Sequence, residues 1–105
     1  MKHINNEERT EVYADAIETY GPVAQLVVAL EELSECQKEI CKVLRDKGDM
    51  KHLAEEVADA IIMLEQIRQI FGINEDVCSV MDEKIIRLQK RIADEKERRK
   101  ANVYT

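Results

Sequence analysis

Residues 49–72 read DMKHLAEEVADAIIMLEQIRQIFG, the pattern of one amphipathic helix with a signal at each end. Asp49 is a residue type that often caps the first turn of a helix, and Gly72 suits the left-handed conformation that often follows the last turn. Between them, apolar residues recur at alternating steps of four and three, as in a helix packed in a bundle. This stripe consists of Leu53, Val57, Ala60, Leu64, Ile67 and Phe71. The pattern predicts a helix from Asp49 to about Phe71.

The rest of the chain offers few other breaks. It has one proline and three glycines among 105 residues, and it is rich in residue types that favour helices. Breaks are expected at Gly21-Pro22, at Lys47-Gly48-Asp49 and at Gly72-Ile73-Asn74. They divide the chain into four helical stretches, so we expect an all-α fold without a sheet, in a single domain over residues 1–105.

The other three helices differ in how clearly the sequence defines them. A first helix over about residues 5–19 is weak, and the N-terminal segment 1–20 is expected to be partly irregular before the proline. That proline suits the first turn of a long second helix over about residues 22–46. Asn74 can cap a fourth helix, which continues into a charged tail at 93–105.

Charge and composition narrow the class of protein. The chain carries 22 acidic and 16 basic residues, a formal net charge of −6, which argues against a dedicated nucleic-acid-binding protein because such proteins present a basic surface. Its cysteines, Cys36, Cys41 and Cys78, lack CxxC spacing and are expected to be reduced. It has neither a signal-peptide core nor an apolar run of roughly eighteen residues, so we expect a cytoplasmic protein with no membrane partner.

Two acidic groups on neighbouring expected helices are the clearest functional signal. Glu31-Glu32-Leu33-Ser34-Glu35 is followed twenty residues later by Glu56-Val57-Ala58-Asp59. In each group, carboxylates stand one turn apart on the same side of a helix. Glu56 and Asp59 border the apolar stripe, together with His52, for which an exposed position near the loop is the preferred interpretation. Carboxylates beside a core are costly to bury unless a cation neutralises them.

The second helix has an apolar and an acidic side. Its apolar stripe, interrupted by Gln37, consists of Leu26, Leu30, Leu33, Ile40 and Leu44. Glu32, Glu35 and Glu39 lie nearly opposite, flanked by two valines. We therefore expect neighbours on both sides of this helix, either its own fourth helix or another copy of the chain, and at least a homodimer.

The residue types indicate which ligands such a site would take. Carboxylates without cysteine or histidine at ligand spacing suit Mg²⁺, or Mn²⁺, better than zinc, and protein-bound Mg²⁺ commonly shares substrate phosphates. The fourth helix carries Lys84, Arg87 and Arg91 along one edge, and such cations can hold phosphate oxygens. A solvated face explains any one of these groups more simply, since 36% of the chain is charged. Two acidic pairs on adjacent amphipathic helices together favour a metal and phosphate site.

The pattern Glu-Glu-x-x-Glu, twenty residues, Glu-x-x-Asp resembles that of the MazG-like all-α nucleoside triphosphate pyrophosphohydrolases, in their short single-domain bacterial or phage form. The similarity covers roughly residues 21–92, and its two-part acidic motif is moderately specific for the superfamily. It implies a four-helix MazG-like bundle whose protomers form a dimer or tetramer. It also implies hydrolysis of a (d)NTP to a (d)NMP and pyrophosphate by water that attacks the α-phosphorus.

The resemblance also implies roles for particular residues. The Mg²⁺ ligands would be Glu32, Glu35, Glu56 and Asp59. The carboxylate that accepts a proton from water would be Glu31 or Glu35, with Glu31 otherwise an auxiliary ligand. The groups that contact the substrate would be Lys84, Arg87, Arg91 and Gln25. Base stacking has few candidates, because tryptophan is absent and only Tyr13 or Tyr20 could enter a pocket.

Other function classes stay open. A non-catalytic helical interaction protein would have only solvated acidic faces, and its charged tail would suit a partner helix. Phosphoribosyl-ATP pyrophosphohydrolase, within the same superfamily, shares the acidic layout. A di-iron carboxylate bundle is weaker, because no histidine stands three residues after Glu32 or Glu56.

Overall fold

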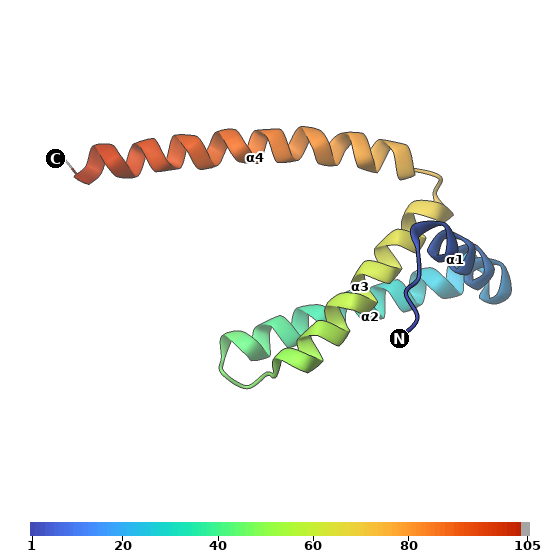
Figure 1. The fold of residues 1–105 in the computed structure, drawn as a ribbon. Coiled ribbons are helices and arrows are strands. Elements are labelled where there is room, and N and C mark those ends of the chain that lie inside the picture. The colour runs from blue at the N-terminus through green and yellow to red at the C-terminus, as the bar shows by residue number, and fades with distance from the viewer. Residues whose placement is uncertain (104–105) are drawn as a thin grey trace. The chain divides into compact units, whose positions relative to one another are not determined.

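The computed structural model describes residues 1–103, and their regular structure is entirely helical (Figure 1). The helices are α1 (Asn6–Tyr20), α2 (Pro22–Leu44), α3 (Met50–Ile70) and α4 (Asn74–Val103). The predicted all-α class and its four helices are confirmed. The chain divides into a first unit, Met1–Gly72, which contains α1 to α3, and a second unit, which begins at Ile73 and contains α4. The bundle arrangement of the four helices and their association into oligomers stay predictions.

Local signals set the ends of α3 as the sequence indicates. Asp49 is the N-cap residue, and its Oδ1 accepts a hydrogen bond from the backbone N–H of His52 at 2.8 Å. Gly72 follows the helix with φ +61°, a conformation that glycine adopts without steric cost. Because both signals lie within one turn of the helix end, they act without help from the rest of the fold.

The N-terminal segment is more regular than expected. Residues 6–20 form one continuous helix, so the expected irregular stretch before the proline is wrong. Asn5 caps this helix by accepting from the N–H of Glu8 at 2.8 Å, and Gly21, with φ +88°, ends it. Tyr13 is buried, and α1 contacts both α2 and α3. A side-chain cap and a tertiary contact thus support a helix whose sequence is weakly amphipathic.

The helices α2 and α3 lie side by side across the short loop at residues 45–49 (Figure 1). The predicted apolar stripes of α2 and α3 are only partly buried in this pair. Leu30, Leu44 and Phe71 are 70%, 80% and 59% exposed. The buried residues of the pair are Gln25, Ala29, Glu39, Ala60, Met63 and Gln66. The helices therefore pack through the acidic side of α2, where small Ala29 and Ala60 allow close approach, and Leu30 and Leu44 of the α2 stripe are exposed.

The second unit is a single helix of 30 residues, α4, with no buried residue. Ion pairs one turn apart support its C-terminal half, including Lys90 with Asp94 at 3.0 Å and Arg99 with Glu95 at 3.1 Å. Its apolar residues are exposed, among them Ile85 at 52% and Ile86 at 64%.

The cysteines are free, with Cys36 half-buried and Cys41 and Cys78 exposed. Within residues 1–103, every helix is too short or too polar to cross a membrane.

Candidate metal centre

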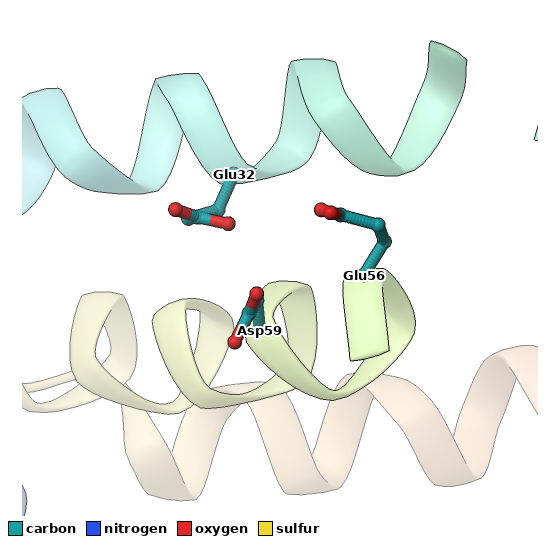
Figure 2. A group of neighbouring side chains, drawn as sticks. All are labelled: Glu32, Glu56 and Asp59. Carbon is teal, nitrogen blue, oxygen red and sulfur yellow. The ribbon is translucent and has the colours of Figure 1, made fainter. Parts of the chain in front are cut away.

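Three carboxylates from two helices converge between α2 and α3. Glu32 comes from α2, and Glu56 and Asp59 stand one turn apart on α3, and all three point into the space between the helices (Figure 2). One oxygen of each lies within 4.8 Å of the others. Residues 24 and 27 positions apart in sequence are brought together because the 45–49 loop turns the chain back on itself.

Burial and the neighbouring carboxylates raise the pKa of Glu32. Partial burial raises its pKa above the ordinary value of 4.5, and the negative charges of Asp59 and Glu56, a hydrogen bond with Asp59 and the charge of Glu31 raise it further. Each effect disfavours the ionised form, because the charge is partly removed from water and placed beside like charges. A cation between these carboxylates would reverse the balance.

Glu56 has one paired and one unpaired oxygen. Its Oε1 lies 3.1 Å from His52 Nε2. Its Oε2 is buried and lacks a hydrogen-bond partner within the described part of the chain. A buried carboxylate oxygen without a partner costs free energy, and a hard cation is a partner that would satisfy it. With oxygen as the only donor atom in the group, the site fits Mg²⁺ or Mn²⁺.

The structure leaves Glu35 and Glu31 outside the converging group. Glu35 is exposed and its Oε1 lies 3.3 Å from Lys38 Nζ. Glu31 is also exposed, next to Glu32 on α2, and acts on that neighbour through its charge. The metal-binding role of Glu35 and the proton-accepting role of either residue stay predictions.

Gln25 is buried in the packing of the two helices. Its Nε2 donates to Gln66 Oε1 at 2.7 Å, and Gln66 Nε2 in turn lies 3.8 Å from the sulfur of Met63. These contacts give Gln25 a structural role between α2 and α3. Its contact with a substrate stays a prediction.

The predicted phosphate-binding cations lie on α4. Lys84, Arg87 and Arg91 are exposed along this helix, which belongs to the second unit. The converging carboxylates belong to the first unit.

Tyr13 lines a hollow of about 680 Å³ between α1 and α3, together with Ala58, Ile61 and Glu65. Burial and a hydrogen bond to Glu65 raise its pKa to about 12. On a helix with 3.6 residues per turn, Ala58, Ile61 and Glu65 lie on a different side of α3 from Glu56. Tyr13 thus faces away from the Glu32, Glu56 and Asp59 carboxylates.

The contacts of Glu39 and the bridging position of His52 were not predicted from the sequence. Glu39 is 3% exposed, and its Oε2 lies 3.3 Å from His52 Nδ1 and 3.8 Å from Lys42 Nζ. His52 is exposed as predicted, but its ring bridges Glu39 and Glu56. The signal was present in the spacing, because Glu39 follows Glu32 by two helical turns and His52 precedes Glu56 by one.

Comparison with known proteins adds no relative. No protein-family model, no curated protein and no solved structure matches the chain. The likeness to MazG-like enzymes therefore depends on the acidic motif and the residues around it.

Proposed function

We propose that this protein is a Mg²⁺-dependent nucleoside triphosphate pyrophosphohydrolase of the MazG-like type. The observation that carries the proposal is the convergence of Glu32, Glu56 and Asp59 within 4.8 Å from two helices. Like charges this close are unfavourable without a counter-ion, so the arrangement fits a site for a divalent cation.

The carboxylate oxygens of Glu32, Glu56 and Asp59 would hold the ion. When bound, Mg²⁺ supplies positive charge that stabilises phosphate oxygens during phosphoryl transfer. Such ions usually share their coordination between a few carboxylates, waters and substrate phosphates. Three carboxylates between α2 and α3 fit that division.

The chain's own residues would do the remaining chemistry. Water adds to the α-phosphorus, the bond from that phosphorus to the bridging oxygen breaks, and the nucleoside monophosphate and pyrophosphate leave. Glu31 or Glu35, exposed beside Glu32, would accept the proton of the water. Lys84, Arg87 and Arg91 would bind the triphosphate oxygens. The sequence has no P-loop and no Ser-His-Asp set, which favours direct attack by water.

We also propose that the protein works as a homodimer or tetramer. The packing of α2 and α3 leaves Leu30 and Leu44 exposed at 70% and 80%. Apolar surface of this kind on a soluble helix usually marks a contact between chains, and closed symmetric assemblies are the common outcome.

The deciding experiment follows pyrophosphate release from a panel of standard and modified nucleoside triphosphates and phosphoribosyl-ATP, with Mg²⁺ or with EDTA. We expect release only with Mg²⁺, and at least a hundredfold loss in Glu56→Gln, because even the loss of an outer partner of a metal ligand typically costs about 10- to 100-fold. Glu55→Gln is the matched control, because Glu55 is exposed and adjacent on the same helix. Turnover of phosphoribosyl-ATP alone would select the related biosynthetic activity.

A helical interaction protein is the second candidate, favoured by one observation. The 30 residues of α4 form a helix with no buried residue. If no nucleotide is turned over and neither Mn²⁺ nor nucleotide binds in calorimetry, this candidate replaces the hydrolase.

A further inference from the structure

Glu39 has a buried carboxyl group that is tightly packed by the neighbouring loop. Its side chain is 4% exposed, beside the loop that leads into α3. A Cβ atom added at Gly48 would lie 3.2 Å from Glu39 Oε1 and 2.7 Å from Val43 Cγ2. The loop therefore packs its bare backbone against the Glu39 carboxylate, which limits the positions that this carboxylate can take.

His52 is fixed to this corner at two points. Its backbone N–H donates to the cap residue Asp49 at 2.8 Å, and its ring Nδ1 lies 3.3 Å from Glu39 Oε2. The other ring nitrogen, Nε2, then lies 3.1 Å from Glu56 Oε1. An imidazole held at its backbone and at one nitrogen can direct its second nitrogen to a defined place.

We propose that His52 is a positioning residue of the metal site: it ties Glu56 Oε1 to the buried Glu39 and so leaves Glu56 Oε2 free to bind the cation. This inference rests on the proposed function of the Glu32, Glu56 and Asp59 group. It agrees with the unequal state of the two Glu56 oxygens, of which Oε1 has a partner and the buried Oε2 has none in the described part of the chain.

Among the three carboxylates, Glu56 is the one that has an oxygen held by His52. A free glutamate has three rotatable side-chain bonds, and fixing it on metal binding costs side-chain entropy. His52 would lower that cost in advance, because one oxygen is already held. Removing an outer partner of a metal ligand typically lowers metal affinity about 10- to 100-fold.

The test measures Mn²⁺ affinity of the metal-free full-length protein, without nucleotide, from the electron paramagnetic resonance signal of free Mn²⁺. His52→Ala should weaken binding about 10- to 100-fold. Lys51→Ala, an exposed neighbour on the same turn, should bind as the wild type does. Wild-type affinity in His52→Ala overturns the inference while leaving the proposed function standing. Wild-type protein that binds no Mn²⁺ at millimolar concentration overturns both.

Two amide variants distinguish positioning from a purely structural role, even if His52→Ala fails to fold. The amide nitrogen of His52→Gln stands near the place of Nε2 and can donate to Glu56, whereas that of His52→Asn stands near Nδ1 and can reach only Glu39. Positioning predicts that Gln restores most of the Mn²⁺ affinity and that Asn remains at least tenfold weaker. Equal affinities in the two variants, or tighter binding by Asn, overturn the inference.

Discussion

At the scale of the residue, the pKa of Glu32 reflects its position beside other carboxylates. Its pKa is raised above 4.5 by burial and by the neighbouring carboxylates. The folded state therefore holds the proton more tightly than the unfolded state does. The resulting penalty is absent below the ordinary pKa and grows as the pH rises through the raised value, so ionisation of Glu32 destabilises the metal-free fold at neutral pH.

Replacing Glu32 by Gln should therefore stabilise the metal-free protein. Relief of like-charge contacts worth a few tenths of a kcal/mol each gives a rise in Tm of about 1–3 °C at pH 8 in EDTA, with a smaller rise at pH 5. Added Mn²⁺ should raise the Tm of the wild type by mass action but not that of the variant. Thermal unfolding followed by circular dichroism measures both effects, with Glu55→Gln as the charge-matched control. A variant less stable than the wild type in EDTA at pH 8 would contradict this account.

Tyr13 makes a second prediction at this scale. Its pKa is raised to about 12, first by burial and then by Glu65, so the folded state favours the protonated phenol. The stability that this provides is present below the ordinary pKa of 10.0 and is lost as the pH rises from 10 to about 12. Tyr13→Phe should lose about 1 kcal/mol at pH 8 with its hydrogen bond, and its stability should depend less on pH above 10. Urea unfolding at pH 8 and pH 10.5 tests this, and equal pH dependence in both proteins would refute it.

At the scale of the element, α3 depends on its first turn. Asp49 caps the helix through the N–H of His52, and the same turn carries the ring that bridges Glu39 and Glu56. The cap therefore links helix formation to the geometry of the candidate site.

Removing this cap should cost stability. Asp49→Ala is expected to lower the free energy of unfolding by about 1 kcal/mol, because the N–H of His52 loses its acceptor, whereas Asp49→Asn keeps an acceptor and should cost only a few tenths. Urea denaturation with an unchanged m-value measures the difference. If the two variants are equally stable, the hydrogen bond from the His52 N–H to Asp49 does not stabilise the first turn of α3.

At the scale of the whole molecule, one side of α2 is packed and much of its apolar stripe is exposed. The acidic side packs against α3, and Leu30 on the opposite stripe is 70% exposed. A helix with apolar residues on one side and a packed neighbour on the other requires a second cover in water. We propose that a second copy of the chain supplies this cover.

Size-exclusion chromatography with light scattering should accordingly give at least a dimer at micromolar concentration. Leu30→Glu should shift the species toward monomer, since a charge in an apolar interface costs several kcal/mol unless it is paired. Ala24→Glu adds the same charge at an exposed position on another side of α2 and should leave the assembly intact. A monomeric wild type would contradict the assignment.

The sequence by itself determined the elements of this protein. Four helices, the Asp49 cap and the glycine at position 72 follow from local capping and from the proline and glycine positions, because these interactions act within one or two turns. Only the tertiary structure decided which sides of the helices meet. Periodicity says which residues share a side of a helix, but not which neighbour covers it. For this reason the sequence did not show that the helices pack through the acidic side of α2, and the grouping of Glu32 with Glu56 and Asp59, apart from Glu35, depended on the packing of α2 against α3. The bridge from Glu39 through His52 to Glu56 depended on it too, because its residues come from two helices joined by a turn.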